Sequence, residues 1–236
     1  GMTLLPTLKQ RLARIDNLID LEKCGLDKIV LREGLLNIGA MVTHFDVSNS
    51  ALVKTENPAI AQLASHIGDR QVRNRGTIGG SLANNDPSAC YPAAILAMSG
   101  TIHTTKRDIK AENFFVDLFE TALEEDEIIT SVSLPKPERA AYEKFPNPAS
   151  RYAIVGIFVA KFDSEVRVAV TGAGEEGVFR CQQIETALSA KFLPESLSEI
   201  NISADGLMSD IHAGADYRAH LIVELAKRAV AKSIAR

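Results

Sequence analysis

The segment Thr77-Ile-Gly-Gly-Ser-Leu-Ala-Asn-Asn-Asp-Pro87 combines two adjacent glycines with a run of short polar side chains. Consecutive glycines allow the backbone to take positive φ and remove the Cβ atoms that would hold a ligand away. Their N–H groups can then converge on an oxyanion. Ser81 can add a hydroxyl donor to that oxyanion, and the side chains of Asn84, Asn85 and Asp86 can reach ribose or ribityl hydroxyls. The segment therefore predicts a loop that binds a diphosphate flanked by such hydroxyls.

FAD and NAD both have that combination of groups, but the glycine pair matches neither of the common nucleotide-binding motifs. It is not GxGxxG and not GxxxxGK[ST], so a Rossmann or P-loop mechanism is not indicated. An isolated Gly-Gly pair between a strand and a helix is more often a tight turn than a ligand site. The segment by itself leaves both interpretations open.

Composition and charge exclude several classes of protein. The chain has 236 residues and a net charge of −4, which argues against a broad nucleic-acid surface because phosphate binding needs a basic field. No apolar run approaches the length of a membrane-spanning helix, and the start does not resemble a signal peptide. The cysteines are odd in number and form no CxxC pair, which favours reduced thiols. We therefore expect a cytoplasmic protein without a membrane span.

Metal-ligating patterns are also missing from the sequence. Cys24, Cys90 and Cys181 are too widely spaced for an all-cysteine iron–sulfur cluster or a structural zinc site held by this chain alone. The five histidines fall in no close ligand pattern, and each is interpreted as a surface or capping residue. The acidic run Glu124–Glu127 is interpreted as a solvated turn. The sequence predicts no metal site.

Periodicity and breakers indicate an α+β protein of two domains. Pro135-Lys-Pro137 is the best boundary, because two prolines disfavour both helix and sheet. We predict one domain over 1–135 and a smaller sheet-plus-helices domain over 140–236. Helices are expected at 6–13, 45–53, 58–68, 87–98, 182–190 and 216–235. Strands are expected at 18–21, 28–31, 36–38, 101–105, 128–134, 142–145, 152–162 and 166–171.

The glycine segment and its surroundings resemble the second FAD loop of the flavoprotein subunits of molybdenum hydroxylases. These are the medium subunits of carbon monoxide dehydrogenase and xanthine dehydrogenase type enzymes. The similarity covers nearly the whole chain and keeps its order. It is carried by Gln71–Ala83, Asn85-Asp-Pro87, Tyr91-Pro92, Glu127-Ile-Ile-Thr130, Lys144-Phe145, Pro148–Gly156 and Asp216–Leu221.

The resemblance implies an FAD-binding domain of that type followed by the family's C-terminal domain. It assigns the diphosphate to the glycine segment, and the polar residues after it to the cofactor. It also places an apolar residue near the flavin and two residues of the second domain over the ring. The cofactor-binding residues implied are Gly1, Thr3, Leu4, Thr77, Ile78, Gly79, Gly80, Ser81, Asp86, Ile129, Lys144 and Tyr152.

Two departures from the family pattern bear on the cofactor. The family commonly has an acidic residue three positions after the proline of the polar segment, and here that residue is Cys90. A thiol cannot replace a carboxylate as a strong acceptor. The start, Gly1–Pro6, resembles only the second half of the family's first FAD loop, without the strand unit that precedes it. We therefore expect the FAD affinity of this chain to be lower by orders of magnitude, so that the chain as given is flavin-free, and we expect the region before Pro6 to pack poorly or rearrange.

By this resemblance the chain is an electron-transfer subunit and part of an oxidoreductase. Electrons would pass from a molybdenum site on a large subunit, through iron–sulfur clusters on a small subunit, to this FAD and on to a small-molecule acceptor. Two alternatives remain open at this point. One is a non-catalytic assembly module that has lost flavin binding, and the other is a stand-alone flavin oxidase.

Overall fold

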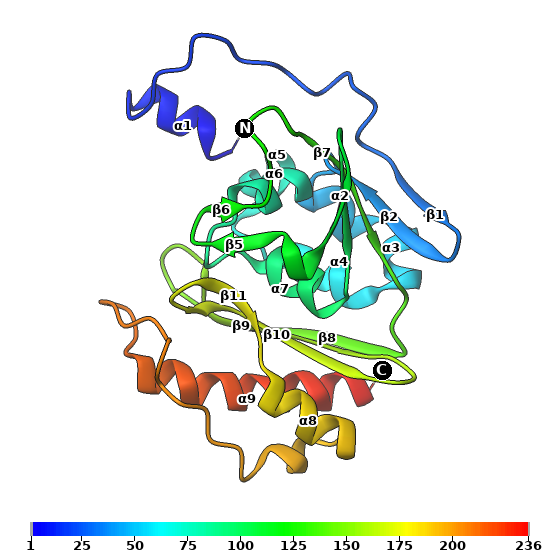
Figure 1. Cartoon of the computed structure of the whole chain (residues 1–236), viewed down its shortest axis with the longest axis vertical. Coiled ribbons are helices and arrows are strands. Elements are labelled where there is room, and N and C mark those ends of the chain that lie inside the picture. The colour runs from blue at the N-terminus through cyan, green and yellow to red at the C-terminus, as the bar shows by residue number, and fades with distance from the viewer. Residues whose placement is uncertain (1, 236) are drawn as a thin grey trace.

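The computed structural model describes residues 2–235, and its first layer is a five-stranded antiparallel sheet. The strands lie in the order β1-β2-β7-β3-β4, of which β1, β2 and β7 are labelled in Figure 1. β7 pairs with both β2 and β3, so the strand that ends the first predicted domain lies at the centre of the sheet. The bounds are β1 (Ile29–Arg32), β2 (Leu35–Gly39), β3 (Thr101–Thr104), β4 (Asp108–Lys110) and β7 (Ile129–Leu134). A short hairpin beside it consists of β5 (Phe115–Asp117) and β6 (Glu120–Thr121).

Short helices between β2 and β3 pack on this sheet, and most begin with a side-chain cap. The capping oxygens of Thr43, Ser50, Asn57, Asp69 and Thr77 each accept a hydrogen bond from the backbone N–H three residues later. Such caps satisfy N–H groups that the first turn of a helix leaves without partners. The helices are α2 (His44–Asn49), α3 (Ala51–Glu56), α4 (Pro58–Ser65), α5 (Arg70–Arg75), α6 (Ile78–Asn84) and α7 (Cys90–Ala97).

One predicted helix is two helices in the structure. The helix expected at 45–53 is interrupted at Ser50, whose backbone is extended at ψ 123°. Ser50 ends α2 and caps α3, because its hydroxyl accepts from the N–H of Val53 at 3.3 Å. Serine competes for backbone hydrogen bonds in this way, which is why it favours caps over helix interiors.

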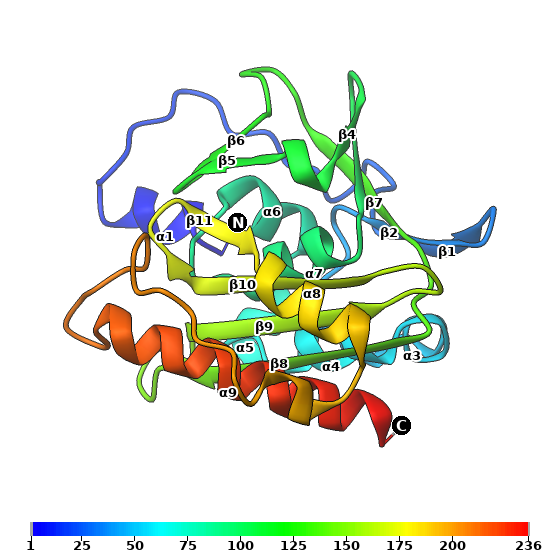
Figure 2. The same cartoon turned by 60° about the horizontal axis from the view of Figure 1, so that its bottom comes forward.

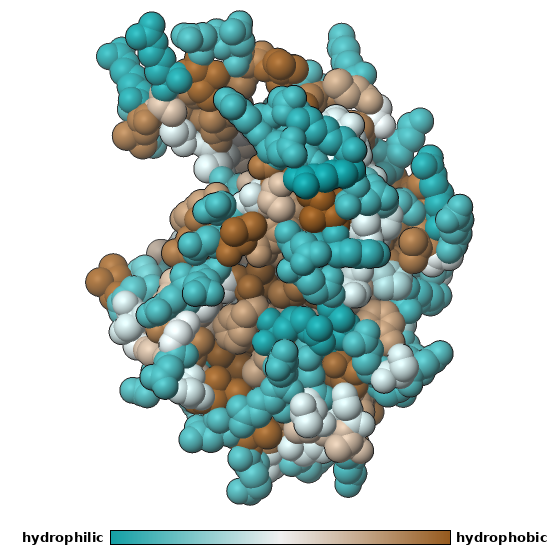
Figure 3. All heavy atoms as spheres, viewed as in Figure 1, coloured by the Kyte–Doolittle hydropathy of each residue, from teal (hydrophilic) through white to brown (hydrophobic). Residues whose placement is uncertain are grey.

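The N-terminal segment packs loosely against the rest of the molecule. None of the residues of α1 (Leu4–Lys9) is buried, and the strand expected at 18–21 is wrong, because those residues form no strand. A strand needs a neighbour to receive its backbone hydrogen bonds, and none lies beside this segment among residues 2–235. Its apolar side chains therefore face solvent, and Leu12 and Ile19 are 73% and 78% exposed. Hydrophobic atoms are visible along the top of the molecule, where the N-terminal segment runs (Figure 3).

A second antiparallel sheet follows the Pro135-Lys-Pro137 boundary, with the order β11-β10-β9-β8. One face packs on α4 and α7, while the other is covered by two C-terminal helices (Figure 2). Because both faces are covered, nearly every residue of β9 and β10 is buried. The bounds are β8 (Arg139–Pro146), β9 (Ala153–Lys161), β10 (Val166–Gly174), β11 (Gly177–Arg180), α8 (Gln182–Ala190) and α9 (Ala215–Ile234).

Side chains of β9 alternate between two hydrophobic clusters. Phe158 and Ala160 belong to the cluster that contains the first sheet and α7. Val155, Ile157 and Val159 belong to the cluster beneath α8 and α9. Successive side chains of a strand point to opposite faces of its sheet, so β9 joins the two halves of the chain through a shared core. The cavity described below lies where these halves meet.

The acidic run is not a solvated turn throughout, because the side chain of Glu127 is buried. Its carboxylate accepts hydrogen bonds from Arg107 at 3.1 Å, from the backbone N–H of Glu124 at 2.9 Å and from Thr104 at 2.6 Å. The Arg107 guanidinium is the largest cause that lowers the pKa of Glu127 from 4.5 to about 2. This carboxylate ties the loop after β3 to the segment that leads into β7.

We expect Glu127 to make stability depend on pH below neutrality. A carboxyl whose folded-state pKa is depressed stabilises the fold above its unfolded pKa of 4.5, and this contribution is lost as the pH falls towards 2. Glu127→Gln removes the titration but keeps an acceptor oxygen. Urea denaturation at about pH 5 and about pH 3 should show a smaller acid-induced drop in midpoint for the variant. Equal drops in both proteins would contradict the prediction.

Candidate functional site

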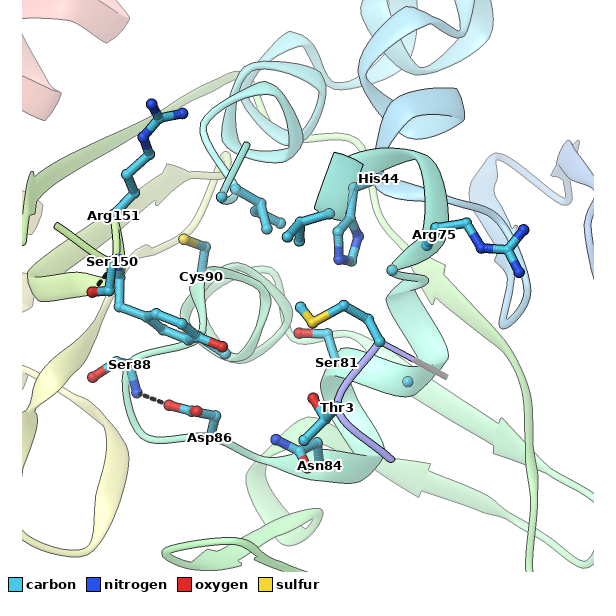
Figure 4. Close-up of a pocket in the computed structure, with 18 of the residues that line it drawn as sticks. Thr3, His44, Arg75, Ser81, Asn84, Asp86, Ser88, Cys90, Ser150 and Arg151 are labelled. Carbon is cyan, nitrogen blue, oxygen red and sulfur yellow. Dashed lines mark hydrogen bonds between the residues drawn. The ribbon is translucent and has the colours of Figure 1, made fainter. Parts of the chain in front are cut away.

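A cavity of about 600 Å³ opens where the two halves of the chain meet. Its walls are the segment before α1, the region from the end of α4 through α6, the start of α7 and the loop between β8 and β9. Figure 4 shows side chains from these separate segments facing one space. The volume lies within the range of about 300–1,000 Å³ usual for small-molecule and cofactor sites.

The two glycines do not form the loop that the sequence predicts. Gly79 and Gly80 lie inside α6, and neither has positive φ. Their N–H groups also have protein partners, which are the carbonyl of Ala40 at 2.9 Å for Gly79 and the hydroxyl of Thr77 at 3.2 Å for Gly80. The expected nest of free N–H groups in a left-handed turn is therefore wrong.

The two glycines are explained by what lies beside each of them, and not by a need for positive φ. A Cβ on Gly79 would lie 2.5 Å from the Cβ of Ala40 and 2.8 Å from its carbonyl oxygen. Gly79 is buried there and lets α6 pack against the chain that follows β2. Gly80 is exposed and lines the cavity, and among residues 2–235 a Cβ there would meet only the Thr77 hydroxyl, at 3.0 Å. Gly79 thus serves the fold, and Gly80 presents bare backbone to a ligand.

The structure brings most of the predicted cofactor residues together at this cavity. The residues that line it are Thr3, Leu4, Thr77, Gly80, Ser81, Asp86, Lys144 and Tyr152. The remaining predicted residues do not line it: Ile78, Gly79 and Ile129 are buried in the surrounding protein. Gly1 lies outside the described residues.

Lys144 places a fixed positive charge in the wall. Its ammonium group donates to the carbonyl of His66 at 2.7 Å and to that of Arg151 at 3.0 Å, and lies 3.5 Å from the Cys90 sulfur. These partners come from α4, α7 and the β8–β9 loop, so the ammonium joins both halves of the chain. Arg75 and Arg151 also border the cavity, with their guanidinium groups extending outward at its rim (Figure 4). One cation in the wall and two at the rim favour a ligand with negative charge.

Asp86 and Tyr152 form the side of the cavity nearest the second sheet. Burial raises the pKa of Asp86, although its carboxylate accepts a hydrogen bond from the backbone N–H of Ser88 at 2.8 Å. Burial, and then the charge of Asp86, raise the pKa of Tyr152, whose side chain remains partly exposed. A tyrosine in this position offers a ring face for stacking and a hydroxyl for hydrogen bonding.

His44 was not predicted as a site residue, yet it lines the cavity and is only 3% exposed. The interpretation of this histidine as a surface or capping residue is wrong. Burial, and then the charge of Arg73, lower its pKa from 6.5 to about 4. The sequence around it indicated only a helix start after Thr43. Its role depends on packing between α2 and the segment before α6, which no local pattern records.

The cavity residues suit a diphosphate-containing dinucleotide. Lys144, with Arg75 and Arg151 at the rim, can offset its charge. The Ser81 hydroxyl can donate to its diphosphate, and the side chains of Asn84 and Ser88 can bind its sugar groups. Gly80 leaves space that a Cβ would fill, and the imidazole of His44 also borders the cavity. These features fit FAD.

Comparison with known proteins identifies the family. The model of the FAD binding domain in molybdopterin dehydrogenase matches residues 1–137. This chain belongs to the FAD-binding medium subunits of the molybdenum hydroxylases. It is an oxidoreductase subunit, and FAD is its cofactor.

Relatives of this flavoprotein subunit match along the whole chain. It is 35% identical to the nicotine 6-hydroxylase medium subunit of Paenarthrobacter nicotinovorans, over 100% of this chain and 88% of that protein. It is 29% identical to the carbon monoxide dehydrogenase medium chain of Hydrogenophaga pseudoflava, with the same coverage. The structure of carbon monoxide dehydrogenase from that organism matches with a TM-score of 0.88, at 30% identity over 100% of this chain and 88% of the other. These matches confirm the α+β fold and the resemblance.

Cys90 of the flavoprotein subunit offers a direct test of the cavity wall. Cys90→Asp is expected to tighten FAD at least about tenfold, because a carboxylate can accept a cofactor hydroxyl while Lys144 balances its charge. Titration of the apoprotein with FAD would measure the change. Cys90→Asn is the matched control without the negative charge. An affinity that is unchanged or weaker in Cys90→Asp would show that residue 90 does not face the cofactor.

Proposed function

We propose that this subunit holds FAD in the cavity and carries electrons between redox centres on partner subunits and a small-molecule acceptor. The cavity supports this proposal, because it combines bare backbone at Gly80, three cations and a row of sugar-binding polar groups. FAD when bound supplies the redox chemistry, and the protein supplies its position and electrostatic environment.

Different residues along the cavity would bind different parts of the cofactor. Gly80 and the hydroxyls of Thr77 and Ser81 would receive the diphosphate, since no side chain at Gly80 blocks its approach. Lys144 would hold charge beside the cofactor in a fixed geometry, because both halves of the chain bind its ammonium group. Tyr152 would cover an aromatic ring of the cofactor from the second domain, while Ile129 would act only through the packing behind the cavity.

Partner subunits would provide the metal centres. Within residues 2–235 there is no group of three or more His, Cys, Asp or Glu side chains that could hold a metal ion. The relatives are named as medium subunits or medium chains, which implies companions of other sizes. We propose a small iron–sulfur subunit and a large subunit with the molybdenum cofactor as partners. No helix between residues 2 and 235 is long and apolar enough to cross a membrane.

Flavin binding and partner-dependent reduction together test the proposed function. When FAD is titrated into the purified chain, its fluorescence should be quenched until one equivalent of FAD per chain is bound. Under anaerobic conditions the bound flavin should then be bleached by substrate only when both partner subunits are present. A chain that does not bind FAD but still assembles with the partners would support the assembly-module alternative. Bleaching by substrate without partners would support a stand-alone oxidase.

A further inference from the structure

His44 lies in the cofactor cavity at a position fixed from several sides. It is the first residue of α2, and its backbone N–H donates to the carbonyl of Gly76 at 2.9 Å. Its ring lies 5.4 Å from that of Tyr91 in α7. A Cβ on Gly76 would come within 2.6 Å of the His44 Nε2 atom, so only glycine leaves room for the ring. Figure 4 shows the imidazole among the residues that face the cavity.

Backbone contacts also hold the start of α2, where His44 lies, beside the start of α6. Thr43 and Thr77 form an isolated antiparallel bridge, and the N–H of Ile78 donates to the carbonyl of Val42 at 3.1 Å. His44 directly follows Thr43 in the chain, and α6 begins directly after Thr77, so the bridge holds the two helix starts together. Thr77, Gly80 and His44 all line one cavity, so a ligand that contacts Thr77 or Gly80 occupies the space that this ring borders.

The protonation state of His44 determines what its ring can do. The lowered pKa keeps the imidazole neutral at neutral pH, so one nitrogen carries a hydrogen and the other accepts. The Nδ1 atom is buried and has no partner among the described residues. A buried N–H without a partner is rarer than a buried acceptor without one. The hydrogen is therefore assigned to Nε2, beside Gly76 in the cavity wall.

We propose that His44 is a cofactor-binding residue, which donates a hydrogen bond from Nε2 to an acceptor oxygen or ring nitrogen of the bound dinucleotide. This inference rests on the proposed FAD site and adds a neutral donor to it. A neutral donor differs from Arg75 and Lys144, because it recognises an acceptor atom without adding charge. The close fit at Gly76 and the contact with Tyr91 hold the ring in place before the ligand arrives.

Three variants separate hydrogen bonding from packing. His44→Gln keeps an N–H donor near the Nε2 position, and His44→Phe keeps a flat ring against Tyr91 but has no donor. Tyr91→Phe keeps the ring contact and removes a hydroxyl that has no hydrogen-bond partner among residues 2–235, so it serves as the matched control. Dissociation constants for FAD are measured by fluorescence quenching, and melting of each apoprotein is followed by circular dichroism.

We expect His44→Phe to weaken FAD binding about tenfold, the loss of one hydrogen bond, with His44→Gln and Tyr91→Phe within about threefold of wild type. The melting temperatures of the apoproteins should not follow the same order as their FAD affinities. Wild-type affinity in His44→Phe, or equal losses in His44→Phe and His44→Gln, would overturn this inference alone. A wild-type chain that binds no FAD would overturn the proposed function together with it.

Discussion

Gly79→Val is expected to destabilise the fold by about 3 kcal/mol, because a side chain at this position meets backbone and not open space. An added Cβ lies 2.5 Å from the Ala40 Cβ, 2.8 Å from its carbonyl oxygen and 2.9 Å from its Cα. Neither α6 nor the end of β2 can move without breaking the hydrogen bond from Gly79 to Ala40. Thermal melting of the apoprotein should fall by about 6–12 °C.

A second substitution at the same contact checks the cause. Gly79→Ala already introduces the clashing Cβ and should also lower the melting temperature. Ala40→Gly removes one of the atoms that it meets, so the double variant should recover part of the loss. Melting of Gly79→Val at the wild-type temperature would show that α6 does not pack on Ala40 in solution.

Gly80→Val is expected to weaken FAD binding about a hundredfold or more while leaving the apoprotein folded. Gly80 is exposed to the cavity, and within the described part of the chain its added Cβ meets only the Thr77 hydroxyl, at 3.0 Å. The branched side chain would occupy the space through which the diphosphate approaches α6, and it would disturb the hydroxyl that caps the helix. FAD titration gives the affinity, and circular dichroism confirms the fold.

Comparison of the two glycine variants separates cofactor binding from folding. Gly80→Val should melt within a few degrees of the wild-type apoprotein, whereas Gly79→Val should not. Gly80→Ala should lie between wild type and Gly80→Val in FAD affinity, because its single methyl group fills less of the space. Wild-type flavin content in Gly80→Val would place the cofactor away from this part of the cavity.

The resemblance found in the sequence indicated the family and its cofactor, and the comparisons confirm both. The motifs could be read because each is a short run of residues, such as Gln71–Ala83, and because they keep their order. The same runs contain most of the residues that line the cavity. The presence of Thr77, Gly80, Ser81 and Asp86 at one site follows from one continuous segment.

Local signals also determined much of the secondary structure. Thr43 and Asn57 cap helices, and the β-branched runs at Ile129–Leu134 and Ala153–Lys161 form strands within the predicted ranges. Caps act over about three residues and strand alternation over two, so both are visible in a short window of sequence. The segment at 18–21 has a similar apolar pattern but forms no strand, because pairing requires a neighbour as well as a pattern.

Only the tertiary structure decided the roles of Gly79, Glu127 and His44. Gly79 is glycine because Ala40 lies against it, and Glu127 is buried because Arg107 and Thr104 supply donors. His44 is neutral and faces the cavity because Tyr91 and the Gly76 backbone enclose it. Burial and hydrogen bonding belong to pairs of groups that are distant in the chain. Their energies arise only when the fold brings the partners into contact and excludes water, so no single stretch of sequence contains them.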